Sequence, residues 1–195
     1  MPLVILEYPI TVVARTGKPA FKNTPFNGVG IAVKEINEQG RIMGRSIQFI
    51  EIDNQSTALG SKIAAQKAVN KKVIAVIVAR WSSHPLAIAQ ICQAGKNPVI
   101  SPYSNNPQVT RVGDFIFRVC YIDRFQGAVK ASFSLRHLNA MKAEILINTD
   151  SIYSEGLANY FADHYRKQGG EILFEENYLD KAADFVFLVD KIKLQ

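Results

Sequence analysis

Two short polar segments contain the residue types that could bind a small charged molecule. Ser82 and Ser83 stand between an apolar run and a helical pattern, and Ser104 and Asn105 belong to a second segment, "SPYSNNP". Serine hydroxyls, amide groups and the backbone N–H groups at a helix start can together hold an anion. A carboxylate accepts several hydrogen bonds and suits such a set of neutral donors. These residues therefore predict a binding site for a small carboxylate.

The residue pattern leaves other roles open for the first segment. A serine at a helix start often caps the helix, and two serines allow one to cap while the other binds a ligand. A phosphate is less favoured, because the chain has no GxxxxGK[ST] loop and Gly28 and Gly30 lie inside a predicted helix. Trp81, directly before the serines, could line a pocket or pack in the core.

The chain lacks the motifs expected of an enzyme. No GxSxG sequence surrounds the two serines, and His84 starts a helix, where we expect it at the surface. Asp53, Asp123 and Asp150 fall at predicted strand ends, but their positions imply no pairing. The sequence therefore predicts binding without catalytic residues, and a nucleotide-dependent α/β enzyme is the weakest alternative.

Metal and cofactor binding are not expected either. The candidate ligands Cys92, Cys120, His84, His137 and His164 show no metal-ligand spacing. Nothing in the pattern places the two cysteines together, so two buried thiols are expected rather than a disulfide. We expect no metal and no cofactor.

The charge distribution argues against nucleic-acid binding. Residues 1–120 contain 14 Lys and Arg against 6 Asp and Glu, whereas residues 121–195 contain 9 against 11. The basic residues are scattered and form no stripe with interleaved aromatic residues, as a nucleic-acid surface would require. The change of sign near residue 120 instead suggests two halves. The first residues lack the basic region of a signal peptide and read as an opening strand.

Strand-like and helix-like patterns alternate along the chain. Strands are predicted at 10–14, 45–53, 72–79, 97–101, 114–120, 142–148 and 171–178, and helices at 25–40, 54–69, 84–94, 123–138, 153–170 and 184–194. This alternation is typical of α/β proteins with parallel sheets covered by helices. The rhythm restarts after "FRVCYID", so we predict two Rossmann-like (flavodoxin-like) lobes, 1–120 and an incomplete 121–195, joined by a hinge near Val119–Asp123.

Several segments resemble a known family in their order and spacing. They are "NGVGIAVKEINEQGRIMGRSIQFIEIDNQS", "ARWSSHPLAIAQ", "NPVISPYSNNPQVT", "FIFRVCYIDRFQG" and "SIYSEGLANYFADHYRKQGGEI". Together they resemble the branched-chain (Leu/Ile/Val-type) amino-acid-binding proteins of ABC transporters, from about Ile10 to Leu194. The resemblance implies the type I periplasmic binding fold and a second lobe that is truncated at Gln195.

The resemblance also assigns roles to individual residues. It implies that Ser82 holds a ligand α-carboxylate, that the backbone carbonyl of Tyr103 receives the ammonium, and that Asn105 is a second carboxylate donor. In the same way it implies that Phe21 closes over the ligand and that Asp123 and Tyr153 face the cleft from the second lobe. The complete set of predicted ligand-binding residues is Phe21, Trp81, Ser82, Ser83, Tyr103, Ser104, Asn105, Asp123 and Tyr153.

The resemblance thus implies a periplasmic or extracytoplasmic solute-binding protein. It would capture an amino acid or similar small carboxylate and deliver it to an ABC permease in the membrane. The alternative is a ligand-sensing receptor or regulator domain of the same fold, in which closure signals instead of delivering cargo.

Overall fold

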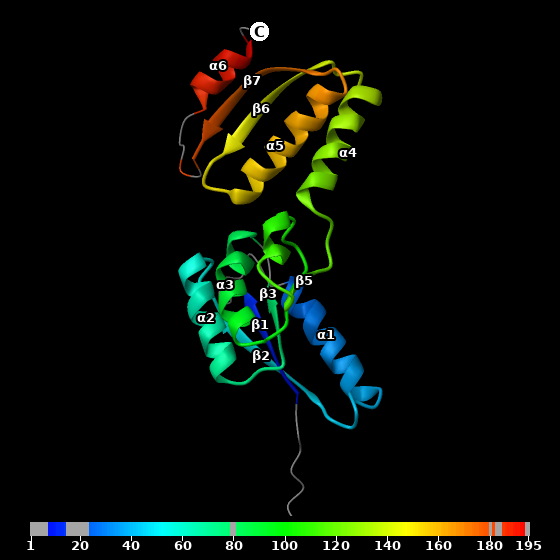
Figure 1. Ribbon diagram of the computed structural model, residues 1–195, viewed down its shortest axis with the longest axis vertical. Helices are drawn as coiled ribbons and strands as arrows, with labels where there is room; N and C mark the ends of the chain where they lie inside the picture. The colour runs from blue at the N-terminus through cyan, green and yellow to red at the C-terminus, as the bar shows by residue number, and fades with distance from the viewer. Residues whose placement is uncertain (1–7, 15–23, 79–80, 180, 182–184, 194–195) are drawn as a thin grey trace, which may run out of the picture. The chain divides into compact units, whose positions relative to one another are not determined.

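The computed structural model describes residues 8–14, 24–78, 81–179, 181 and 185–193, and the chain forms two compact units (Figure 1). The first unit takes Met1–Ser104 and Gln108–Cys120, and the second takes Asn105–Pro107 and Tyr121–Gln195. Each unit has its own sheet and its own apolar core. Units of this kind have the organisation of separate domains.

The first unit is a five-stranded parallel sheet with helices on both faces (Figure 1). Its elements are β1 (Tyr8–Ala14), α1 (Thr24–Glu38), β2 (Ile47–Asp53), α2 (Ala58–Asn70), β3 (Ala75–Val78), α3 (Ser83–Ala94), β4 (Val99–Ser101) and β5 (Ile116–Arg118). The strand order is β2-β1-β3-β4-β5. This is the flavodoxin-like order, in which the winding direction reverses between β1 and β3.

The centre of this sheet is formed by short β-branched runs. Val76 and Val78, which share one face of β3, and Val99 of β4 are fully buried. Each such side chain contributes about 1.5–3 kcal/mol through burial. Helix α2 covers them with alanines, among them Ala65 and Ala68, whose small side chains let the helix approach the sheet closely. Thr57 caps this helix by accepting a hydrogen bond from Gly60 N at 2.9 Å.

The second unit is smaller and contains a two-stranded parallel sheet. Its elements are α4 (Asp123–Arg136), β6 (Lys142–Asn148), α5 (Ile152–Lys167), β7 (Glu171–Tyr178) and α6 (Val186–Lys193). Ile145 and Ile147 point from β6 to Ala158 and Ala162 of α5 and form the core with them. The two isoleucines are two residues apart and therefore share one face of the strand, and the two alanines are four residues apart and therefore share one face of the helix.

Helix α4 packs closely on α5, and Gly127 is the reason that it can. A Cβ atom at Gly127 would lie 2.7 Å from Tyr160 Cβ and 2.8 Å from Phe161 N, which is closer than van der Waals contact allows. This packing orients the start of α4, where Asp123 lies.

The predicted α/β class with parallel sheets is confirmed, and the predicted elements all occur with boundaries shifted by a few residues. Within the described ranges, no helix has both the length and the apolar character needed to cross a membrane.

Candidate functional site

The two polar segments singled out in the sequence leave adjacent strands at the same edge of the first sheet. β3 and β4 are parallel neighbours, with Ile77 opposite Ile100, so the chain leaves both strands in the same direction. Trp81 follows the end of β3 closely, and Pro102 directly follows β4. The neighbour of β3 on its other side is β1, and this pair is where the winding reverses. Crevices at such a reversal, beyond the carboxyl ends of the strands, are the preferred ligand sites of open α/β sheets.

Ser82 lies at the N-terminus of α3 and is buried, with 4% of its surface exposed. Its backbone is helical (φ −58°, ψ −26°), whereas a capping residue usually has an extended backbone. Within the described chain its hydroxyl makes no capping hydrogen bond. The capping role left open by the sequence is therefore not used, and the hydroxyl lies beside the positive end of the α3 dipole.

The residues around Ser82 differ in their exposure. Trp81 is 57% exposed and Tyr103 is 52% exposed, whereas Ser83 is half-buried. The sequence left open whether Trp81 lines a pocket or packs in the core, and its exposure excludes packing in the core of the first unit. Both aromatic side chains are accessible at the edge of the sheet where the polar segments lie.

His84 is buried, and the prediction that it lies at the surface was wrong. Only 4% of the residue is exposed, and its Nδ1 lies 3.2 Å from Asn54 Nδ2. Ser56 N donates to Asn54 Oδ1, which identifies the amide nitrogen as the group facing the imidazole. Nδ1 therefore acts as the acceptor in this contact. The packing of α3 on α2 buries the first turn of α3, which the local sequence does not reveal.

Ser104 is also buried, and its backbone is used to shape the second segment. Its N–H donates to Ser101 Oγ at 3.2 Å, and its carbonyl accepts from Arg118 Nη1 at 3.0 Å. Ser101, at the end of β4, and Arg118, at the end of β5, were not singled out in the sequence. Only the pairing of β4 with β5 brings them together.

In the second unit, Asn105 holds the start of α4. Its carbonyl accepts from Asp123 N at 2.9 Å, and its Nδ2 donates to Tyr121 O at 3.0 Å. Asn105 was predicted to donate to a ligand carboxylate. One hydrogen of its side-chain amide is directed to the protein backbone, and the second hydrogen is left for another acceptor.

Asp123 is the first residue of α4 and is fully buried. A Cβ atom at Gly156 would lie 3.6 Å from Asp123 Oδ2 and 3.7 Å from Asn106 Nδ2, so the carboxylate and this amide both face the start of α5. Tyr153, one residue after the start of α5, is half-buried and donates its hydroxyl to Gln126 Oε1 at 3.4 Å. Asn106 and Gly156 were not predicted, because neither residue type carries a local signal of its own.

The predicted site residues thus fall into two groups. Trp81, Ser82, Ser83, Tyr103 and Ser104 belong to the first unit, and Asn105, Asp123 and Tyr153 belong to the second. Phe21 lies outside the described residues.

The described residues include no group of three or more His, Cys, Asp or Glu side chains that could hold a metal ion. Cys92 and Cys120, both within the described chain, are not joined by a disulfide. Burial raises the pKa of the Cys92 thiol to about 11, so this thiol is protonated at neutral pH. Cys120 is only half-buried, contrary to the expectation for both thiols.

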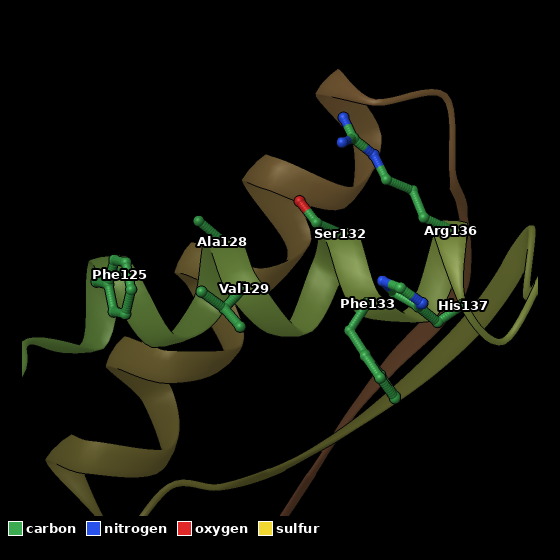
Figure 2. Close-up of a pocket in the computed structure, with 7 residues that line it drawn as sticks. All are labelled: Phe125, Ala128, Val129, Ser132, Phe133, Arg136 and His137. Atoms are coloured by element: carbon green, nitrogen blue, oxygen red, sulfur yellow. The ribbon is translucent and has the colours of Figure 1, made fainter.

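An apolar surface of a different kind lies on α4 (Figure 2). It is lined by Phe125, Ala128, Val129, Ser132, Phe133, Arg136 and His137. Figure 2 shows these side chains on α4 and, for His137, on the residue that follows its last turn, and the rings of Phe133 and His137 stack with centroids 5.2 Å apart. This surface is open and mainly apolar, with its polar groups Ser132, Arg136 and His137 towards the C-terminal end of the helix.

The family of periplasmic binding proteins matches residues 11–195 of this chain. The chain belongs to this family. An amino-acid-binding protein of Pseudomonas aeruginosa is 29% identical over 176 residues, which cover 89% of this chain and 47% of that protein. The leucine-specific-binding protein of Salmonella typhimurium is 28% identical over 169 residues, covering 86% and 46%. The chain spans about half the length of the curated relatives it matches.

Solved structures show the same relationship. A leucine-binding protein from Thermotoga maritima is 30% identical with a TM-score of 0.85, over 95% of this chain and 53% of that one. A branched-chain amino acid transporter substrate-binding protein from Streptococcus pneumoniae, in complex with isoleucine, is 26% identical with a TM-score of 0.88, over 97% and 55%. The predicted family and the type I periplasmic binding fold are confirmed. The family and these relatives are binding proteins rather than enzymes.

Proposed function

We propose that this chain binds an amino acid or a similar small carboxylate as the solute-binding component of an ABC transporter. The observation that carries the proposal is the N-terminus of α3. Ser82, directly before the first residue of α3, is buried near the point where the winding of the parallel sheet reverses. Within the described chain its side chain makes no capping hydrogen bond. Its hydroxyl, the adjacent backbone N–H groups and the helix dipole suit a carboxylate head group.

We extend the proposal to the other residues that the family resemblance singles out. The second polar segment leaves the neighbouring strand, and in this proposal the backbone carbonyl of Tyr103 accepts a hydrogen bond from an ammonium group. In the second unit, Asp123 supplies a negative charge and Asn105 has one amide hydrogen left for a carboxylate. Tyr153 and Phe21 are proposed to contact the ligand side chain. We assign no catalytic residue.

The partners and the location are part of the same proposal. The relatives named above include a transporter substrate-binding protein, which supports delivery to a membrane permease. Membership of a family described as periplasmic supports an extracytoplasmic location.

Calorimetric titration of the chain with the twenty standard amino acids tests the proposal. A wild-type chain that binds none of them, nor any other carboxylate-bearing solute, would contradict it. If a solute binds, Ser82→Ala should weaken its affinity about tenfold to a hundredfold, because a hydrogen bond to a charged group is worth about 1.5–3 kcal/mol.

Ser46→Ala is the matched control. Ser46 directly precedes β2 in the same unit, at the amino end of the parallel strands and therefore at the opposite edge of the sheet. It should leave the affinity unchanged. Equal effects of the two substitutions would show that the α3 N-terminus is not the carboxylate site.

A further inference from the structure

A buried set of polar side chains joins the end of β2 to the first turns of α2 and α3. Asn54 directly follows β2 and is fully buried, Ser61 lies in the first turn of α2, and His84 is the second residue of α3. The Asn54 Nδ2 atom lies 2.9 Å from Ser61 Oγ and 3.2 Å from His84 Nδ1. A single side-chain amide thus connects α2 and α3 at the carboxyl end of β2, within the first unit.

Two hydrogen bonds fix which end of the Asn54 amide faces the imidazole. Ser56 N donates to Asn54 Oδ1 at 3.1 Å, which identifies the amide oxygen. The Ser61 hydroxyl donates its one hydrogen to Thr57 O at 2.8 Å, so its oxygen can only accept from Asn54. Both observations place Nδ2 beside Ser61 and His84, and the two hydrogens of the amide are directed to these two partners.

The orientation of this amide decides which nitrogen of the His84 ring carries the hydrogen. An amide N–H meets the ring at Nδ1, so Nδ1 presents a lone pair. The ring is therefore neutral with its hydrogen on Nε2, because an imidazolium carries hydrogens on both nitrogens. A neutral ring also suits this position, since a cation is disfavoured at the N-terminus of a helix.

The same contact reaches the α3 N-terminus that the proposed function uses. His84 follows Ser82 by two residues, and its N–H donates to Trp81 O at 2.9 Å. In the same turn, Leu86 N donates to Ser82 O at 3.3 Å. A ring that is held at Nδ1 therefore steadies the turn that contains Ser82, and a binding group whose supporting residues are fixed costs less to order when the ligand binds.

We propose that Asn54 is a positioning residue of the carboxylate site, which holds His84 as the neutral Nε2–H tautomer and thereby fixes the first turn of α3 and the Ser82 hydroxyl. The role in binding rests on the proposed function, whereas the tautomer is a property of the ligand-free chain. This role requires a donor at position 54 and an acceptor at position 84, which a general contribution to stability would not.

Long-range proton–nitrogen NMR of the ligand-free wild-type chain at neutral pH tests the tautomer, because protonated and unprotonated imidazole nitrogens resonate far apart. The chain has 3 His, and the signals that disappear in His84→Asn assign the ring. We expect His84 to carry its hydrogen on Nε2 and none on Nδ1. A ring with a hydrogen on Nδ1, or on both nitrogens, would overturn the proposal.

Asn54→Asp keeps the shape of the side chain and replaces the donor by an acceptor. A hydrogen should therefore appear on His84 Nδ1, and the affinity for L-isoleucine should fall about tenfold. Asn70→Asp is the matched control, because Asn70 lies at the exposed end of α2, where its Oδ1 accepts from Gln66 Nε2, and the substitution adds the same charge to the same unit. It should change neither the ring nor the affinity. A wild-type His84 ring in Asn54→Asp would contradict the proposal.

Two substitutions of His84 separate positioning from general stability. His84→Asn keeps an acceptor, since asparagine Oδ1 and histidine Nδ1 are both bonded to Cγ, whereas His84→Leu removes it. Exchange of the Leu86 amide hydrogen should rise about tenfold in His84→Leu and less than about threefold in His84→Asn. The Gly95 amide, which donates to Ile91 O at the other end of α3, should exchange as in the wild type. Equal exchange of the Leu86 amide in the two variants, or an equal rise at Leu86 and Gly95, would refute the positioning role.

Calorimetric titration of the same variants with L-isoleucine completes the test. We expect weaker binding by His84→Leu and nearly wild-type binding by His84→Asn, and an equal loss in both would count against the proposal. Failure of the wild-type chain to bind any amino acid would contradict the proposed function, whereas the tautomer and the exchange pattern would still decide whether Asn54 positions α3.

Discussion

The close packing of α4 on α5 depends on Gly127, and we expect Gly127→Ala to weaken it. The new Cβ would lie 2.7 Å from Tyr160 Cβ and 2.8 Å from Phe161 N, and the latter is a backbone atom that cannot rotate away. Overpacking of this kind costs about 1–3 kcal/mol, and backbone contact places this case at the upper end. The higher helix propensity of alanine returns about 1 kcal/mol. The second unit should therefore lose about 1–2 kcal/mol.

Gly30→Ala is the matched control. Gly30 lies within α1, and a Cβ there would meet nothing within 4 Å. The same substitution should consequently stabilise the first unit by about 1 kcal/mol through helix propensity alone. The two substitutions should therefore change the free energy of unfolding in opposite directions, although the chemical change is the same.

Urea unfolding with two probes measures both effects. The chain has 1 Trp, Trp81, so tryptophan fluorescence reports on the first unit, whereas far-UV circular dichroism reports on both. With a denaturant slope of about 2 kcal/mol/M, Gly30→Ala should raise the fluorescence midpoint by about 0.5 M. Gly127→Ala should lower a circular dichroism transition by about 0.5–1 M. A Gly127→Ala chain as stable as the wild type would refute the assignment of Gly127 as the contact that sets the α4–α5 distance.

Two other predictions concern the buried thiol and the Asp123 site. Burial raises the pKa of the Cys92 thiol from 9.0 to about 11. Between pH 9 and pH 11 the unfolded chain therefore releases a proton that the folded chain keeps. The free energy of unfolding consequently falls as the pH rises through this range. Chemical denaturation at pH 8 and 10 should show a loss of about 1.4 kcal/mol that is missing in Cys92→Ala; an identical loss in both chains would contradict it. Gly156→Leu should fill the space beside Asp123 and abolish calorimetric binding of L-isoleucine, whereas Gly156→Ala, whose Cβ would lie at ordinary contact distances of 3.6 and 3.7 Å, should bind it as the wild type does.

Much of the fold could be predicted because its pattern is local. The run 72–79 is apolar and β-branched on both faces, and β3 within it is the central strand, with Val76 and Val78 fully buried. A strand without a polar face is stable only when both faces are covered, so one short segment already indicates a parallel sheet with helices on either side. The polar segments after β3 and β4 could be located for the same reason, since they interrupt this pattern.

The partners of individual polar groups could not be predicted in this way. His84 reads as a surface residue at a helix start, yet the packing of α3 against α2 buries it beside Asn54. Arg118 reads as one of many scattered basic residues, yet the pairing of β4 with β5 brings it to Ser104 O. In each case the partner lies more than ten residues away along the chain.

The sequence alone thus determined the strand and helix segments, the α/β class and the position of the polar segments along the chain. These properties arise from hydrophobic periodicity within a few turns of helix or residues of strand. Only the tertiary structure decided the strand order, the assignment of 105–107 to the second unit and the hydrogen-bond partners of His84 and Arg118. The physical reason is that a buried donor or acceptor must find a partner wherever packing provides one, and packing brings together segments that are distant in the sequence.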